Sequence, residues 1–423
     1  MLKSKKIMND TVAIILAAGL GTRMKSDLPK VLHQAGAETM LSRVINSLKS
    51  SGINRIIAVV GHGAELIEEK YGDKIELVRQ KELLGSGDAL KSAVAGLGDH
   101  PGDILVTCGD TPLITRETFR NMLCEHGKNN SSCTLLTCIL DDPGSYGRIV
   151  RDKNGDVACI REEKDASPEE KNIKEINVGT YCFQSAKASE YIHEVSINEK
   201  KKEFYLTDIV DVFRSNNEKI HVYSCTSKEA IGVNSRRDLA MVNSLINTRT
   251  LETLMDKGVT IVDPLTTFID ENAVIGKDTV VFPSTVIEGD VNIASGCRIG
   301  PFARIRPGST ISENTEIGNF VEICRSRIGK NTKIKHHTYL GDAVVGDNVN
   351  IGAGTITANY DGKNKNRTVI KDGAFIGIGA RLIAPVEIGE NARVGAGSVV
   401  TRDKNVPDGA TVVGVPARLF TKN

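Results

Sequence analysis

Large aromatic side chains are scarce in this sequence of 423 residues. It contains no tryptophan, and aromatic residues make up only 4% of it. Long apolar runs are absent as well, so no stretch is expected to span a bilayer. Charge of one sign does not dominate, because 54 Lys and Arg residues stand against 53 Asp and Glu residues. The net charge of +1 therefore gives no indication of a nucleic-acid or membrane partner.

Paired or clustered cysteines are also lacking. The nine cysteines are scattered, with no CxxC pair and no Cys/His cluster at the spacing of a zinc site, which favours a reducing, cytoplasmic environment. The basic N-terminus and the apolar run Val12–Ala18 imitate a signal peptide only superficially. No plausible cleavage site follows in Gly19–Arg23, so the run is predicted to be a buried strand.

Aliphatic residues, by contrast, recur at every sixth position through much of the last third of the sequence. One series runs from Ile275 to Ile323 and a second from Ile376 to Val412. A helix repeats about every 3.6 residues and a strand about every 2, so neither explains this period. Hexapeptide repeats are typical of a parallel β-helix, and at three hexapeptides per coil the region 259–416 predicts about eight coils.

Two irregularities interrupt this rhythm. Five-residue steps lead to Ile328 and Val345, and the rhythm is lost in the polar segment 359–371, which should protrude as a loop. Insertions of this kind in repeat proteins tend to lie on the binding face. The irregular centre of the repeat region is therefore a candidate site.

Apolar runs alternate with amphipathic segments in residues 11–235. The expected strands are Val12–Ala18, Arg55–Val60, Ile75–Val78, Asp103–Cys108 and Cys133–Ile139, and the expected helices are Met40–Ser51, Ala64–Tyr71, Asp88–Leu97 and Arg116–His126. This alternation predicts an α/β domain with a mostly parallel sheet, whose ligands bind at the carboxyl ends of the strands. We expect this Rossmann-like domain in residues 1–235, a connecting helix in 236–258 and the β-helix in 259–423.

A glycine-containing string, LAAGLGTRMKSDLPK, follows the first expected strand at residues 16–30. Gly19 and Gly21 let the backbone approach phosphates, and loop N–H groups can bind anionic oxygens. Arg23 adds a fork of donors suited to phosphate, and Lys30 a mobile positive charge. A lone GxG is usually an ordinary turn, but the whole string resembles the signature of the sugar-phosphate nucleotidyltransferases.

Further motifs follow in the order of that class: Gln80, GSGDA (85–89), CGD (108–110), YGR (146–148), EEKDA (162–166), EINVG (175–179) and GVN (232–234). With HHTYLGDA and VNIGAGTITANYDG in the repeats, nearly the whole chain is similar to the bifunctional bacterial enzymes of UDP-N-acetylglucosamine synthesis. These fuse an N-acetylglucosamine-1-phosphate uridyltransferase to a glucosamine-1-phosphate N-acetyltransferase. The resemblance implies a left-handed β-helix, a homotrimer, Mg²⁺, and UTP, sugar 1-phosphate and acetyl-CoA as small-molecule substrates.

The same resemblance implies roles for residues of the first domain. Arg23 and Lys30 would stabilise the charge of the triphosphate and of the transition state. The remaining nucleotide and sugar contacts would be Leu16, Ala17, Ala18, Gly19, Gln80, Gly85, Ser86, Cys108, Gly109, Asp110, Gly147, Glu162, Asn177 and Asn234.

Asp110 and Asn234 are the implied ligands of Mg²⁺, an ion that needs only one or two protein ligands. Each residue taken alone has a simpler explanation. Asp110 could cap a helix that begins near Pro112, and Asn234 could cap the connecting helix.

His336 is the implied catalytic base of the acetyltransferase, since acetyl transfer to an amine requires a group that takes a proton near neutral pH. His337 occupies a position that is usually apolar, and it could be surface decoration. The implied contacts of the sugar phosphate and acetyl group are Arg306, Tyr339, Asn350, Asn359 and Tyr360, and those of coenzyme A are Ala353 and Ala396.

Several positions depart from the family pattern. Cys324 replaces a lysine that usually contacts phosphate, a loss of about 1–3 kcal/mol of binding unless Arg325 or Arg327 substitutes. Ile378 replaces a serine near the acetyl-CoA site. The usual coenzyme A arginine is replaced by Gly414, with Arg418 as a nearby alternative, and about two coils are missing before Arg306.

Four hypotheses remain open from the sequence. The chain is a bifunctional enzyme, or a uridyltransferase whose β-helix is only a trimerisation scaffold. It is otherwise a non-catalytic member of the class, or an enzyme with a changed sugar or acyl donor. Cys324, Ile378 and Gly414 favour the second hypothesis, whereas His336 and the NYDG loop favour the first, because a scaffold does not require them.

Overall fold

The computed structural model describes residues 10–199 and 202–420, and the chain divides into two compact units. The first unit ends at Asn243 and the second begins at Ser244, so that the division falls within the long helix α9 (Arg236–Asp256). None of the helices in the described part of the chain combines the length and apolar character needed to cross a membrane.

The first unit is built on a sheet with the strand order β11–β7–β10–β6–β1–β4–β5. Its strands are β1 (Val12–Ala17), β4 (Arg55–Val60), β5 (Glu76–Arg79), β6 (Asp103–Cys108), β7 (Cys133–Ile139), β10 (Glu175–Gln184) and β11 (Ile220–Ser224), with β8 (Arg148–Arg151) and β9 (Val157–Arg161) joined to β10. β1 pairs in parallel with β4 on one side and with β6 on the other, whereas β10 is antiparallel to both β6 and β7. The chain thus reverses its direction of progress across the sheet beside β1, where ligands of such folds bind.

Helices cover both faces of this sheet. They are α2 (Met40–Ser51), α3 (Ala64–Tyr71), α4 (Ser86–Val94), α5 (Arg116–Asn129), α6 (Pro168–Lys171), α7 (Ser185–Tyr191) and α8 (Ile209–Ser215), and a small hairpin joins β2 (Gln34–Ala35) to β3 (Glu38–Thr39). Alternate residues of β1 enter different cores: Ile15 packs with α2, α3 and α5, and Ile14 packs with α4, α7 and α8. The sheet is apolar on both faces because helices bury both of them.

The second unit is a solenoid of three parallel sheets. The first sheet holds β12 (Thr260–Ile261), β15 (Val280–Val281), β18 (Arg298–Ile299), β21 (Glu316–Asn319), β24 (Lys333–His336), β27 (Asn350–Ile351), β30 (Phe375–Ile376), β33 (Arg393–Val394) and β35 (Thr411–Val413); β36 (Arg418–Leu419) folds back antiparallel on β35. The second holds β13 (Phe268–Ile269), β16 (Val286–Ile287), β19 (Arg304–Ile305), β22 (Glu322–Cys324), β25 (Tyr339–Gly341), β28 (Ile356–Ala358), β31 (Arg381–Ile383) and β34 (Val399–Val400). The third holds β14 (Val274–Ile275), β17 (Val291–Ile293), β20 (Ser309–Ile311), β23 (Arg327–Ile328), β26 (Ala343–Val345), β29 (Thr368–Ile370) and β32 (Val386–Ile388).

The aliphatic residues that recur at every sixth position form the interior of this solenoid. These residues are almost fully buried and most of them lie in a short strand, as Ile299, Ile317 and Ile334 do in the first sheet. The five-residue steps end at Ile328 and Val345, which both belong to the third sheet, so these steps shorten the passage from the second sheet to the third.

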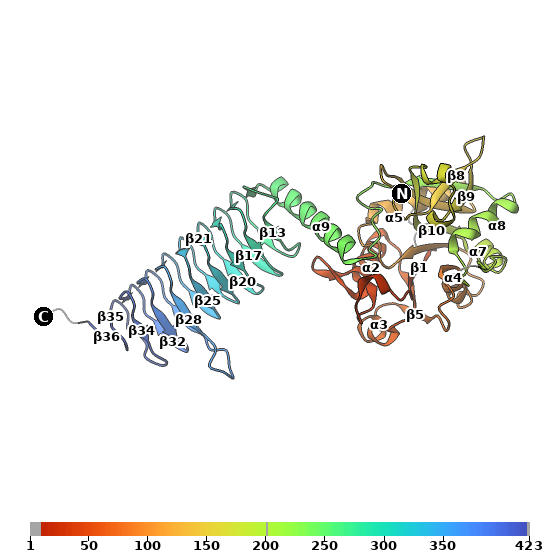
Figure 1. Cartoon of the computed structure of the whole chain (residues 1–423). Coiled ribbons are helices and arrows are strands. Elements are labelled where there is room, and N and C mark those ends of the chain that lie inside the picture. Colours follow the sequence, from red (N-terminus) through yellow and green to blue (C-terminus); the bar gives the residue numbers. More distant parts are fainter. Residues whose placement is uncertain (1–9, 200–201, 421–423) are drawn as a thin grey trace. The chain divides into compact units, whose positions relative to one another are not determined.

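The central coil departs furthest from the repeat. Thr357 takes the aliphatic position in β28, and its hydroxyl accepts a hydrogen bond of 2.9 Å from the Gly341 N–H. After β28 the chain leaves the stack of coils and returns at Thr368. Figure 1 shows this excursion, residues 359–367, as a blue loop that extends from the coils.

Candidate active sites

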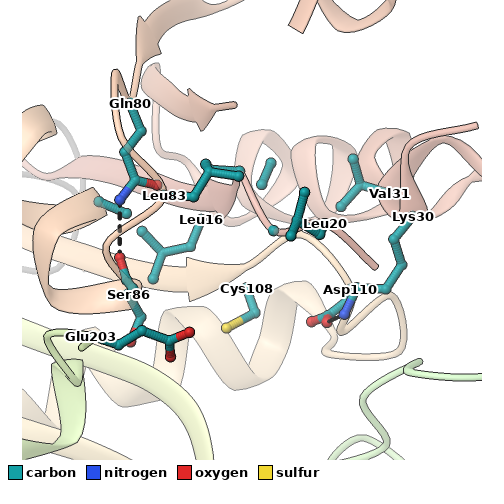
Figure 2. A pocket seen from close by; sticks show the side chains of 15 residues that line it. Leu16, Leu20, Lys30, Val31, Gln80, Leu83, Ser86, Cys108, Asp110 and Glu203 are labelled. Atoms are coloured by element: carbon teal, nitrogen blue, oxygen red, sulfur yellow. Dashed lines mark hydrogen bonds and ion pairs between the residues drawn. The ribbon is translucent and has the colours of Figure 1, made fainter. Parts of the chain in front are cut away.

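The first unit contains a cavity of about 370 Å³ at the carboxyl ends of β1 and β6. The cavity is shown in Figure 2, and it collects residues from segments that are far apart in the sequence. Its lining includes the sequence-predicted Leu16, Ala17, Ala18, Gly19, Lys30, Gln80, Gly85, Ser86, Cys108 and Asp110. The structure therefore brings the loop after β1, the loop after β5 and the end of β6 to one place.

The loop after β1 is folded so that Lys30 reaches the cavity. Gly21 has a φ of 60°, and a Cβ atom there would lie 2.8 Å from the Lys30 Cβ, so a side chain is excluded at this position. A Cβ at Gly19 would meet no atom within 4 Å, which leaves open space above the backbone. Arg23, in the short helix η1 (Thr22–Met24), is exposed and has no ion-pair partner in the described part of the chain.

Lys30 joins the two predicted metal ligands. Its ammonium group forms an ion pair with the Asp110 carboxylate and donates a hydrogen bond of 3.2 Å to the Asn234 Oδ1. Asp110 follows β6, and Asn234 stands at the start of α9, so Lys30 brings both oxygens to one point. Neighbouring Cys108 lines the cavity as an uncharged thiol, because burial and the Asp110 charge raise its pKa to about 12.

Neither predicted metal ligand is a helix cap. Thr115 caps α5 by accepting a hydrogen bond of 3.2 Å from the Thr118 N–H. Ser235 does the same for α9, since its hydroxyl accepts from the Asp238 N–H at 3.3 Å. The side chains of Asp110 and Asn234 are thus free of the simpler role that the sequence left open.

The uridine end of the predicted site is held together by Gln80. The Gln80 amide donates to the Gly85 carbonyl at 3.1 Å and to the Asp88 carboxylate at 2.7 Å. Gly85 has a φ of 102°, and a Cβ there would lie 2.6 Å from the Phe204 carbonyl oxygen. The chain around Gly85 and Ser86 therefore passes so close to Phe204 that only glycine fits.

The three predicted sugar contacts lie close together: Gly147 directly precedes β8, Glu162 directly follows β9, and Asn177 lies in β10. The Asn177 N–H donates to the Gly147 carbonyl at 2.8 Å, and a Cβ at Gly147 would lie 3.6 Å from the Glu162 Oε1. Asn177 is buried, and its amide donates to the Tyr181 hydroxyl at 2.7 Å.

Sequence reasoning missed two parts of this site. One is lining to which no role was given: Leu20 and Ala89 lie within quoted motifs, whereas Val31, Leu83 and Glu203 lie outside them. The other is Tyr146, whose hydroxyl donates to the Ala230 carbonyl at 3.2 Å and accepts from the Gly232 N–H at 3.0 Å. Tyr146 thereby holds the segment that carries Asn234, and its burial raises the pKa of its hydroxyl. Tyr146 is the first residue of the YGR motif, so the motif could have pointed to it.

In the solenoid, His336 ends β24 and is exposed. Its Nδ1 lies 2.5 Å from the Asn319 Oδ1, the side chain that faces it one coil earlier. An amide oxygen can only accept, so this contact favours the neutral tautomer that carries its proton on Nδ1 and its lone pair on Nε2. His337 instead stacks on Phe320, with ring centroids 5.0 Å apart.

A second group of predicted residues surrounds Asp342. Arg325 forms a two-pronged ion pair with the Asp342 carboxylate, with N–O distances of 2.7 and 2.8 Å. Asn359 also donates to Asp342, and these contacts hold the pKa of Asp342 below its ordinary value. Cys324, in place of the usual lysine, is buried beside them, and its Sγ lies 2.9 Å from the Arg325 Nη1.

The predicted acetyltransferase residues are divided between two sheets. The second sheet and its following loop carry Arg306, Tyr339, Asn359 and Tyr360, whereas the first sheet and its corners carry His336, Asn350, Ala353 and Ala396. Within residues 10–199 and 202–420 no hydrogen bond or ion pair joins one set to the other. Ile378 is 60% exposed, and Gly414 precedes the turn into β36.

An α/β unit with a cavity at a sheet reversal that contains Lys30 and Asp110, followed by a hexapeptide solenoid, defines a nucleotidyltransferase joined to a hexapeptide transferase. Two family models agree with this class. Residues 13–147 match the MobA-like NTP transferase domain, and residues 272–307 and 367–402 match the bacterial transferase hexapeptide (six repeats).

Similar proteins cover almost the full chain. The "Bifunctional protein GlmU" of Geobacillus sp. (strain WCH70) is 45% identical over 432 residues, covering 94% of each chain. The GlmU proteins of Heliobacterium modesticaldum and Acetivibrio thermocellus are 41% and 43% identical, covering 96% and 94% of this chain and 96% and 93% of their own. A solved structure, a putative glucose-1-phosphate thymidylyltransferase from Bacillus anthracis with a sucrose, matches 56% of this chain and 94% of that chain (TM-score 0.46, 21% identity).

The chain belongs to the family of bifunctional GlmU proteins. This confirms the predicted family and the predicted fold class, an α/β nucleotidyltransferase domain followed by a left-handed β-helix of hexapeptide repeats. It also confirms the class of enzyme, a bifunctional transferase.

Proposed function

We propose that this chain makes UDP-N-acetylglucosamine by acetylating glucosamine 1-phosphate and then transferring a uridylyl group to the product. The proposal assigns the uridylyl step to the cavity beside β1 and β6, and the acetyl step to the centre of the solenoid. The observation that carries it is the contact of Lys30 with both Asp110 and Asn234 at that cavity.

Uridylyl transfer requires positioning and charge neutralisation more than covalent catalysis. A phosphate oxygen of the sugar phosphate attacks the α-phosphorus of UTP, and pyrophosphate leaves in line. Lys30 and Arg23 would balance the negative charge of the phosphates, while the open backbone at Gly19 and the Gln80 side chain would hold the uridine part. Gly147, Glu162 and Asn177 would position the sugar.

A divalent metal ion fits the donor atoms at Lys30. The Asp110 carboxylate and the Asn234 amide oxygen are hard oxygen ligands, which Mg²⁺ prefers, and Mg²⁺ is usually held by few protein groups. When bound, Mg²⁺ would neutralise phosphate charge. The Lys30 ammonium would then shift its contacts from these two residues to the substrate phosphates.

Acetyl transfer is assigned to His336. Its Nε2 would take a proton from the glucosamine amine as the nitrogen attacks the thioester carbonyl of acetyl-CoA, and the coenzyme A thiolate would leave. The Asn319 contact favours the tautomer with the proton on Nδ1, in which the lone pair of Nε2 would serve this role. Arg306, Tyr339 and Asn359 would bind the sugar phosphate.

The proposal includes a homotrimer. His336 and Asn350 belong to one solenoid sheet, and Arg306 and Tyr339 to another, so a neighbouring subunit would complete each acetyltransferase site. Reducing conditions suit the nine unpaired cysteines, which supports a cytoplasmic location.

The test is a product analysis with single omissions. Purified protein is incubated with glucosamine 1-phosphate, acetyl-CoA, UTP and Mg²⁺, and each reagent is left out in turn. The products are identified by mass spectrometry. Lys30→Ala or Asp110→Ala should reduce pyrophosphate release at least about 100-fold, with Lys25→Ala as the matched control. Wild-type release in both variants would refute the assignment of the first site.

A second candidate function is uridylyl transfer alone, with the solenoid as a scaffold. The observation in its favour is Cys324, because Arg325 beside it is already paired with Asp342 and so is a poor replacement for the missing lysine. His336→Ala, compared with His337→Ala, separates the two. Thiol release from acetyl-CoA that depends on His336 supports the bifunctional enzyme, and no acetylation by wild-type protein supports the scaffold.

A further inference from the structure

Three side chains of different chemistry meet at the opposite end of β6 from the cavity. Asp103 is the first residue of β6, Cys182 lies on the neighbouring β10, and His126 lies near the end of α5. One carboxylate oxygen, one ring nitrogen and the sulfur all lie within 4.8 Å of one another. Strand pairing and helix packing create this group, since the residues are far apart in the sequence.

His126 is oriented toward this group, and its Nε2 makes no hydrogen bond there. Its Nδ1 lies 2.8 Å from the Thr134 hydroxyl, while its Nε2 lies 3.6 Å from the Asp103 carboxylate, beyond hydrogen-bonding distance. The side chain is only 3% exposed, and within the described residues its Nε2 has no hydrogen-bond partner. A buried polar atom without a partner is costly, so a native one requires an explanation.

The donor set matches one kind of metal. Nitrogen, thiolate sulfur and carboxylate oxygen are the ligands of Zn²⁺, whereas Mg²⁺ and Ca²⁺ select oxygen alone. Cys182 is fully buried, but the Asp103 side chain is 23% exposed, which gives an ion access from solvent. Tetrahedral zinc keeps its ligand atoms about 3.3–3.8 Å apart, so a contraction of about 1 Å suffices.

We propose that Asp103, His126 and Cys182 bind a divalent cation of the zinc class, with water as the fourth ligand. The thiol proton of Cys182 leaves to solvent as the sulfur–metal bond forms. In the metal-free protein this thiol is protonated, because burial and then the Asp103 charge raise the pKa of Cys182. Thr134 holds the His126 ring so that Nε2 faces the ion.

The expected effect of the ion is structural. It would tie β6 and β10 to α5 at the base of the sheet, while the other end of β6 lines the cavity at Cys108. The proposal does not depend on the proposed function, since it concerns groups outside that cavity. Binding to the folded chain should raise the melting temperature of the first unit.

Cobalt(II) is the probe of choice, because a cobalt–thiolate bond produces a charge-transfer band in the near ultraviolet. The full chain is stripped of metal, kept reduced with a non-chelating phosphine and titrated with cobalt chloride, and zinc then displaces the cobalt. The wild type should show the band at one equivalent. Cys182→Ala and His126→Gln should lose it, with zinc affinity reduced about 100-fold or more.

Cys133→Ala is the matched control. Cys133 is equally buried and lies on the adjacent β7, but it packs in the core on the opposite face of the sheet from Cys182. This variant should keep the band. Near-ultraviolet circular dichroism establishes that each variant is folded, and His126→Gln decides the question if Cys182→Ala is not. No band in reduced wild-type protein, or a band that survives His126→Gln, would overturn the proposal.

Discussion

At the scale of single residues, Lys30 is expected to have two roles, one in the free protein and one with substrate bound. Its charge satisfies Asp110 and Asn234, two oxygen donors that would otherwise lack a cation in this region of the cavity. The same ammonium group is the one expected to meet substrate phosphate. A residue of this kind keeps a charged site in order before the substrate arrives, because it lowers the cost of holding an unpaired carboxylate.

Asp208 predicts a pH dependence of stability near Glu162, one of the proposed sugar contacts. Burial, followed by the charges of Asp211 and Glu162, raises the pKa of Asp208 from 3.8 to about 6. The folded state therefore binds this proton more tightly than the unfolded state, so the wild type loses stability as pH rises from about 4 to above 6.

Asp208→Asn removes this titration. Relative to the wild type, its free energy of unfolding should increase by about 1–3 kcal/mol over that pH range, as measured by urea unfolding at several pH values. The exposed Asp73→Asn serves as the control and should follow the wild type. A difference between Asp208→Asn and wild type that does not change with pH would contradict the prediction.

Tyr146→Phe tests the anchor of the Asn234 segment. The substitution removes the hydroxyl that joins the Ala230 carbonyl to the Gly232 N–H, and it leaves both groups unpaired. We expect kcat/KM for uridylyl transfer to fall about tenfold and the Mg²⁺ requirement to rise. Tyr223→Phe on β11 is the control, and an unchanged Mg²⁺ dependence in Tyr146→Phe would argue against this anchoring role.

At the scale of elements, the expected bounds hold where a run was continuously apolar or regularly amphipathic. The strands β4, β6 and β7 and the helices α2 and α3 occupy the residues expected for them. β10 was not expected, because Glu175–Gln184 mixes polar and apolar residues and enters the sheet antiparallel through a bulge between Asn177 and Tyr181. Its position depends on distant partners that local patterns do not contain.

The candidate sites likewise contain parts that local sequence patterns predict and parts that depend on distant segments. Motifs located the loops around the cavity, since those loops follow strands whose carboxyl ends meet at one edge. The contact of Lys30 with Asn234 and the meeting of Asp103, His126 and Cys182 join side chains from distant segments. No spacing rule within one segment predicts such contacts.

The loop 359–367 provides a prediction about an element. Asp361 holds it by accepting hydrogen bonds from the N–H groups of Lys363 and Asn364 and from the side chains of Asn366 and Arg402. Asp361→Ala should therefore increase hydrogen exchange throughout the loop. If Tyr360 and Asn359 bind substrate, kcat/KM for acetyl transfer should fall about tenfold while uridylyl transfer stays at its wild-type rate.

Lys363→Ala is the control for this variant, because its side chain is exposed and only its backbone joins the turn. Unaltered loop exchange in Asp361→Ala would show that other contacts fix the loop.

At the scale of the whole molecule, the two units have separate cores. The solenoid core includes Leu251 and Leu254 of α9, whereas the two cores of the first unit lie on the faces of its sheet. Units with independent cores unfold in separate transitions unless an extensive interface couples them.

Calorimetry of the full chain should therefore record two unfolding transitions. Ile317→Ala removes a fully buried side chain of the solenoid and should destabilise that unit by about 2–5 kcal/mol. The other transition and uridylyl transfer at moderate temperature should not change. Ile378→Ala, at an exposed position, should leave both transitions in place, and a single transition that shifts as a whole in Ile317→Ala would contradict independent units.

The backward turn of β36 has a consequence for solubility. A stack of parallel strands ends in a row of unpaired N–H and C=O groups, and such an edge invites polymerisation with the strands of another molecule. β36 pairs antiparallel with β35 and so covers this edge in the first sheet, and it is itself only two residues long and carries the charged Arg418. We therefore expect β36 to block end-to-end association of solenoids through the first sheet.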